Sequence, residues 1–194
     1  MEDPGYFGAI DAFTSAGARL VPVPVDDEGL EVTEGRRRAG RARLAYLTPT
    51  HQFPLGVVMS HPRRLAAPEW ARESGAYLLE YDCDSELRFA VPAILTLQSL
   101  DRAGRVFVVG TFNKLLFPAV RLGYIVLPPA LVDEFLAFRL RTDIHTVEFD
   151  QAVLADEAPR HLRGLLDISP VREWRFTAAR GRSCSGSRCI SLWR

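Results

Sequence analysis

The stretch GTFNKLLFPAVRLGY, residues 110–124, contains Lys114, the single lysine of a 194-residue chain. Since Lys and Arg together number 24, arginine supplies every other basic side chain. Arginine cannot replace a lysine that acts as a neutral amine nucleophile, because a guanidinium does not usefully lose its proton. Lysine amines, in contrast, form Schiff bases with carbonyl compounds. We therefore interpret Lys114 as a candidate nucleophile.

The segments around Lys114 predict an α/β fold with a mostly parallel sheet and flanking helices. Continuous apolar runs, typical of buried parallel strands, lie at 76–82, 105–112 and 123–129. Shorter strands are predicted within 19–32 and 41–50, and helical spacing predicts helices at 60–75 and 131–144. Ligands of such sheets bind at the carboxyl ends of the strands. The polar residues found at those ends are Asp82, Asp84, Thr111, Asn113 and Lys114.

Bulk composition excludes several classes of protein. The formal net charge is zero, which gives no reason to expect a nucleic-acid or membrane partner. No apolar run approaches the ~18–20 residues that a membrane span needs, and MEDPGYFG is too polar for a signal sequence. Three scattered cysteines indicate neither a disulfide scaffold nor a zinc site. We expect a cytoplasmic protein without a metal centre.

The last part of the chain differs from the rest. Residues 171–194 hold six arginines and four serines and show no apolar periodicity. Neither a helix face nor a strand face can be buried from such a pattern. We therefore expect a domain over residues 1–165, followed by a divergent, disordered tail over 166–194.

The stretch 110–124 resembles the G-T-F-S-K-x-L-x-P-x-x-R-x-G-Y signature of fold-type I aminotransferases. Four more segments follow the order of the aminotransferase-like domain of MocR-type, GntR-family regulators: EDPGYFGAIDAF, LTPTHQFPLGVVMS, RRLAAPEWARESGAYLLEYDCDSELRF and VLPPALVDEF. The resemblance covers residues 1–165. It implies a partial fold-type I, pyridoxal-phosphate-dependent transferase large domain, truncated at both ends.

The resemblance also implies roles for individual residues. Lys114 would hold pyridoxal 5'-phosphate as an internal aldimine. Thr111 and Arg121 would contact the cofactor phosphate, where a guanidinium supplies a charge-assisted pair of hydrogen bonds. Tyr6, in the segment DPGY, would stack on the pyridine ring.

Around the cofactor ring, matches and departures both occur. Gln52 or His51, in a loop similar to the family's H-Q-F-P-T-G, could donate to the phenolic oxygen. Tyr81 takes the place of the aspartate that pairs with the pyridine nitrogen, and Cys83 that of a tyrosine contacting the ring oxygen. Asp82 remains as a candidate cofactor-binding residue, although strand alternation points it away from the ring unless the strand slips. Without the acidic partner, transamination should suffer while aldimine formation need not.

Three interpretations remain open. The first is a pyridoxal-phosphate-binding, aminotransferase-like domain that acts on or senses an amino compound, with weak or no transaminase turnover. The second is a non-catalytic, effector-sensing fragment of a transcription regulator, and the third is a decayed, non-functional remnant. The resemblance implies a homodimer in the intact family. The family's DNA-reading module has no counterpart in the matched segments, so we expect no direct nucleic-acid binding by this chain.

Overall fold

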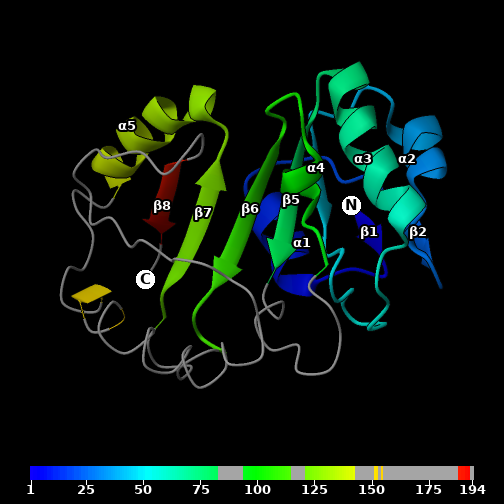
Figure 1. Ribbon diagram of the computed structural model, residues 1–194, viewed down its shortest axis with the longest axis horizontal. Helices are drawn as coiled ribbons and strands as arrows, with labels where there is room; N and C mark the ends of the chain where they lie inside the picture. The colour runs from blue at the N-terminus through cyan, green and yellow to red at the C-terminus, as the bar shows by residue number, and fades with distance from the viewer. Residues whose placement is uncertain (83–93, 115–120, 143–150, 153, 155–187, 193–194) are drawn as a thin grey trace. The chain divides into compact units, whose positions relative to one another are not determined.

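The computed structural model describes residues 1–82, 94–114, 121–142, 151–152, 154 and 188–192 (Figure 1). These residues form two compact units. The first contains residues 1–82 and 94–108, and the second contains the described residues from Val109 onward. Strand β6 (Val106–Thr111) passes from the first unit into the second. Within the described ranges, no helix is both long enough and apolar enough to cross a membrane. The expected domain boundary at residue 165 lies outside them.

The strands of the first unit confirm most of the expected sheet. A three-stranded sheet contains β1 (Glu2–Asp3), β2 (Val23–Asp26) and β3 (Gly29–Leu30), and β1 runs parallel to β2. In a second sheet, β4 (Leu44–Leu47) runs parallel to β5 (Tyr77–Asp82). The start of β5 also meets the start of β6, because the Leu78 N–H donates to the Arg105 carbonyl (2.8 Å). Two strands that begin side by side are parallel, as the sequence predicts.

Four helices belong to the first unit: α1 (Phe7–Ser15), α2 (Val32–Ala39), α3 (His61–Ser74) and α4 (Leu97–Leu100). Helix α3 confirms the helix expected at 60–75. It ends at Gly75, whose φ of 71° is the left-handed conformation that glycine adopts without steric cost. The helix continues through the buried Pro68, which removes one helical hydrogen bond.

Alternation along β4 and β5 separates two differently occupied faces. Leu47 of β4 and Leu78 of β5 are fully buried and belong to the main core, together with Trp70 of α3. The other members of that core are Val23, Leu30, Val32, Met59, Ala67, Ala71, Ala76, Leu97 and Val106. Since successive strand residues point to opposite faces, Tyr46 and Tyr81 lie on the other face. That face carries the aromatic side chains described below.

In the second unit, β7 (Gly123–Leu127) corrects the expectation of a third parallel strand. The Phe112 N–H, just after β6, donates to the carbonyl of Leu122, just before β7 (2.9 Å). The end of β6 therefore lies beside the start of β7, which makes the pair antiparallel. A parallel return needs a crossover of about a dozen residues or more, commonly a helix, and only residues 112–122 separate these two strands.

The rest of the second unit contains a 3-10 turn η3 (Pro129–Leu131), helix α5 (Val132–Thr142) and strand β8 (Arg188–Leu192). Helix α5 confirms the helix expected at 131–144. Strand β8 pairs antiparallel with β7, with Ile190 opposite Ile125. The expectation of disorder is therefore wrong for residues 188–192. Backbone pairing to a neighbouring strand edge needs no long apolar pattern, which is why composition did not predict it. Residues 166–187 lie outside the described residues.

Candidate functional site

Three of the expected site residues lie at the carboxyl end of β6 in the second unit. Thr111 is the last residue of β6, and Lys114 follows in a turn with its side chain exposed. The Thr111 hydroxyl donates to the backbone carbonyl of Leu122 (3.3 Å) and accepts the N–H of Asn113 (3.2 Å). These bonds hold the turn beside Leu122, the neighbour of Arg121. Thr111, Lys114 and Arg121 are therefore brought to one end of the β6–β7 pair.

Two residues near this turn have features that recur at ligand sites. Arg121 has a φ of 49°, and it is the one non-glycine residue with positive φ among those described. This left-handed conformation costs an L-residue about 1–2 kcal/mol, and such strain clusters at ligand sites. Asn113 Oδ1 is buried and has no hydrogen-bond partner within the described part of the chain. An anionic ligand that also carries a hydrogen-bond donor would suit both residues. The Arg121 guanidinium attracts negative charge, and Asn113 Oδ1 accepts a hydrogen bond.

The expected ring-stacking residue, Tyr6, lies in the first unit immediately before α1, where its carbonyl accepts the N–H groups of Ala9 and Ile10 (both 3.1 Å). Its ring is nearly parallel to that of Tyr81, with centroids 5.7 Å apart and planes 6° apart. Tyr81 also lies beside Tyr46, at 6.1 Å and 26°. Tyr6 thus stacks on Tyr81, the residue that takes the place of the aspartate expected from the resemblance.

Asp82 lies on the opposite face of β5 from Tyr81. Buried Glu80 and Asp82 alternate with the half-buried Tyr81, so the strand does not slip. The Glu80 carboxylate accepts the N–H groups of Leu97 (2.9 Å) and Gln98 (3.1 Å) at the start of α4. The pKa of Glu80 is raised to about 7, chiefly by burial; the two backbone hydrogen bonds oppose this rise, and the nearby Asp82 carboxylate contributes to it. Asp82 therefore lies on the same face of β5 as Glu80, and not on the face that meets Tyr6. Cys83 lies outside the described residues.

Gln52 is buried, with 1 % of its surface exposed, and its amide holds the loop around it. Its Nε2 donates to the carbonyls of Pro4 (2.8 Å) and Phe53 (2.7 Å), and its Oε1 accepts the N–H of Leu55 (3.1 Å). The neighbouring His51 is exposed. These bonds use both ends of the Gln52 amide to hold the loop.

Sequence reasoning missed the residues that support this part of the first unit. Glu2 is buried and accepts two hydrogen bonds from Thr48, which ties β1 to the end of β4. Phe53 packs edge-on against Tyr6, with centroids 5.7 Å apart and planes 86° apart. Only Tyr46 had a readable signal, since period-two alternation through β4 places it on the face opposite Leu47.

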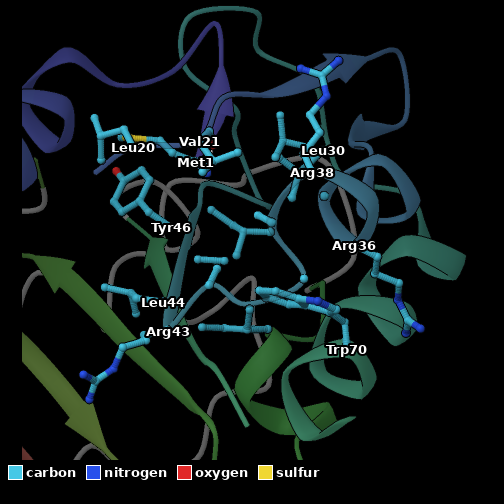
Figure 2. Close-up of a pocket in the computed structure, with 18 of the residues that line it drawn as sticks. Met1, Leu20, Val21, Leu30, Arg36, Arg38, Arg43, Leu44, Tyr46 and Trp70 are labelled. Atoms are coloured by element: carbon cyan, nitrogen blue, oxygen red, sulfur yellow. The ribbon is translucent and has the colours of Figure 1, made fainter. Parts of the chain in front are cut away.

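A cavity of about 670 Å³ opens elsewhere in the first unit (Figure 2). Its lining includes Met1, Leu44 of β4 and Trp70 of α3, with Arg36 and Arg38 of α2 around its edge. None of the six expected site residues lines it. The cavity is therefore a separate feature from the candidate site.

Comparison with known proteins gives a consistent result. The chain is 42% identical over 183 residues to the probable rhizopine catabolism regulatory protein MocR of Rhizobium meliloti, covering 92% of this chain and 37% of that protein. It is 30% identical to aromatic-amino-acid aminotransferase 1 of Thermococcus litoralis, over 79% of this chain and 38% of that enzyme. No protein-family model matches the chain.

Solved structures agree with these relatives. Kynurenine aminotransferase of Pyrococcus horikoshii, solved in complex with PMP, matches with a TM-score of 0.78 and 30% identity, over 86% of this chain and 44% of that one. The chain thus spans less than half the length of these relatives. The chain is thus similar, over most of its own length, to MocR-type regulators and to aminotransferases, and its mixed α/β fold fits part of a fold-type I aminotransferase domain.

Proposed function

We propose that this chain binds pyridoxal 5'-phosphate through Lys114 and senses an amino compound, with weak or no transaminase turnover. The observation that carries the proposal is the meeting of Thr111, Lys114 and the strained Arg121 at one end of the β6–β7 pair. Lys114 would attach the cofactor aldehyde, because it is the one side-chain amine of the chain. Thr111 and Arg121 would hold the phosphate by a hydroxyl donor and a guanidinium.

The residues expected around the pyridine ring fit the cofactor less well than those expected at its phosphate. Bound pyridoxal phosphate acts as an electron sink, and that capacity is greatest with a carboxylate at the pyridine nitrogen. Tyr81 stands at the matching position, and Asp82 lies on the other face of β5. Within the described part of β5, no carboxylate stands at that position, which favours sensing over turnover. The regulatory proteins among the relatives favour the same interpretation.

Attachment of the cofactor is tested by borohydride reduction followed by peptide mass analysis. The expected result is one pyridoxyl group on Lys114 in the native chain and none at that position in Lys114→Arg, which keeps the charge but lacks a nucleophilic amine. The N-terminal amine of Met1 is the natural internal control, because it already donates to the Val21 carbonyl (3.0 Å). Equal labelling of the native chain and Lys114→Arg would contradict the proposal.

The sensing role needs a second measurement. Addition of an amino compound should shift the absorption spectrum of the loaded protein without accumulating a keto product. Tyr81→Asp should raise product formation if the rest of the site is present. Turnover by the native chain at the rate of an ordinary aminotransferase would show that the domain is an enzyme instead.

We also propose that the chain associates as a homodimer, as the resemblance implies. Phe7, Phe53 and Leu55 of the first unit are large apolar side chains with 43% to 63% of their surface exposed. Burying them against a second copy would remove apolar surface from water. Sedimentation analysis over a range of concentrations distinguishes a dimer from a monomer.

A further inference from the structure

The ring of Tyr6 is surrounded by other parts of the first unit. Phe7 lies 5.1 Å from it between centroids, and Phe53 meets it edge-on at 5.7 Å. Gly8 lies so close that a Cβ there would come within 2.9 Å of two ring carbons and the hydroxyl oxygen of Tyr6. A side chain at position 8 would thus displace the Tyr6 ring. These neighbours fix the ring in the position where it stacks on Tyr81.

The gap between Tyr6 and Tyr81 is too narrow for another ring. An aromatic ring placed between two parallel rings needs about 7 Å between them, which is twice a contact distance of ~3.5 Å. The two centroids are 5.7 Å apart, so the plane separation is no larger than that. Tyr81 is also supported by Tyr46 on the neighbouring strand. The face of Tyr6 that points toward β5 is therefore occupied by the protein's own side chain.

We propose that Tyr81 is an internal competitor for the stacking face of Tyr6, and that an aromatic ligand stacks there only after the Tyr81 ring moves away. The ligand class rests on the proposed function, which supplies a pyridine ring bearing a phosphate. Its affinity is reduced by the fraction of molecules in which the tyrosine pair is closed. Tyr81 stands where the resemblance places an aspartate. It therefore both removes the acidic partner and occupies the stacking position beside Tyr6.

The test uses pyridoxine 5'-phosphate, which has a hydroxymethyl group instead of the aldehyde and cannot react with Lys114. Equilibrium dialysis measures its dissociation constant for the native chain and for three variants. Tyr81→Leu, which removes the ring, should bind about two- to tenfold more tightly, the range expected from losing one aromatic pair. Tyr81→Phe keeps the ring and should match the native chain. Tyr77→Leu, on the same face of β5 but packed against Phe107, is the matched control and should not change the affinity.

A measurement on the native chain keeps the proposal testable if Tyr81→Leu does not fold. Saturating pyridoxine 5'-phosphate should increase the nitration of Tyr81 by tetranitromethane, read by peptide mass, because the ring has left its stack. Nitration of Tyr81 that falls or stays constant on binding would overturn the proposal. So would equal affinities of the native chain and a folded Tyr81→Leu.

The two proposals fail in different ways. If Lys114→Arg is labelled like the native chain but Tyr81→Leu binds pyridoxine 5'-phosphate more tightly, attachment is wrong and the competition stands. If Lys114 is labelled and Tyr81 has no effect on ring affinity, the cofactor stacks elsewhere. Binding of pyridoxine 5'-phosphate by none of the chains would overturn the competition, since there would be no stacked ligand to compete with.

Discussion

The carboxylate of Glu2 accepts hydrogen bonds from both the backbone N–H (3.0 Å) and the hydroxyl (2.6 Å) of Thr48. Both residues are buried, with 4% and 3% of their surface exposed. Glu2 belongs to β1 and Thr48 directly follows β4, so these two bonds join the two sheets of the first unit. These two hydrogen bonds between distant parts of the chain thus position the segment that leads into Tyr6.

The first prediction follows from that pair. Thr48→Val keeps the shape of the side chain but removes a donor to a buried carboxylate, which should lower the free energy of unfolding by about 1–3 kcal/mol. Urea denaturation measures the change. Thr33→Val, at an exposed position on α2, is the control and should stay within about 0.5 kcal/mol. Equal stabilities of the two variants would show that the Glu2–Thr48 pair contributes little.

The second prediction concerns the pH dependence of stability. The folded-state pKa of Glu80, about 7, lies above the ordinary value of 4.5, so the folded chain holds this proton more tightly than the unfolded chain. The contribution of Glu80 is fully present below about pH 4.5 and is lost as the pH rises to about 7. The loss amounts to about 3 kcal/mol at most.

Glu80→Gln tests this dependence, because an amide does not titrate. The fall in the free energy of unfolding between pH 4.5 and 7 should be smaller in the variant than in the native chain. Glu2, whose pKa is also raised by burial, keeps part of the slope in both. Glu69→Gln, at an exposed ion pair with Arg72, should leave the slope nearly unchanged. Identical slopes for the native chain and Glu80→Gln would rule out the titration of Glu80 in this range.

The third prediction separates the structural role of Gln52 from a role in ligand binding. Gln52→Glu replaces a donor by an acceptor that faces the carbonyls of Pro4 and Phe53, which should cost about 3 kcal/mol or more at pH 8. Gln52→Leu leaves the same carbonyls unpaired and should cost less. Acidification should restore part of the stability of Gln52→Glu, since a protonated carboxyl can donate again. Native-like stability of Gln52→Glu at pH 8 would show that these bonds are dispensable.

Much of the fold could be predicted because its information is local. Apolar runs predicted β5, β6 and β7, and Gly75 predicted the end of α3. Alternation along β5 predicted that Tyr81 and Asp82 point to opposite faces, which the burial of Glu80 and Asp82 confirms. Each of these features depends on neighbouring residues in the chain, and spacing reports such features well.

What could not be predicted depends on partners far apart in the sequence. The direction of β7 follows from the short path between β6 and β7, which an apolar run does not encode. The pairing of β8 depends on the edge that β7 offers to it. The Tyr6–Tyr81 stack joins residues 75 positions apart. The sequence indicated only that Tyr81 takes the place of an aspartate, not that it stacks on Tyr6. The roles of Thr111, Lys114 and Arg121 in cofactor binding stay predictions.

The fourth prediction concerns the close approach of β6 and β7. A Cβ on Gly110 would lie 2.3–2.6 Å from three atoms at the end of the Tyr124 side chain. Gly110→Ala should therefore cost about 1–3 kcal/mol through overpacking, and adding Tyr124→Leu should recover part of it. Gly35→Ala on α2 is the control, because its Cβ would meet Val23 at an ordinary 3.6 Å. It should be neutral or stabilising, since alanine favours a helix. No recovery in the double variant would show that Tyr124 is not the cause.

The last prediction asks why an arginine occupies a left-handed position. Arg121→Gly removes a steric cost of about 1–2 kcal/mol but adds about 0.5–1 kcal/mol of chain entropy to be lost on folding. Its free energy of unfolding should thus stay within about 1 kcal/mol of the native value or rise slightly. Arg141→Gly, in the helical backbone of α5, should instead lose about 1 kcal/mol. Binding of pyridoxine 5'-phosphate should fall at least tenfold in Arg121→Gly, because a charge-assisted phosphate contact is lost, and should not change in Arg141→Gly. Arg121→Gly that binds as well as the native chain would mean that the arginine at this strained position does not hold the phosphate.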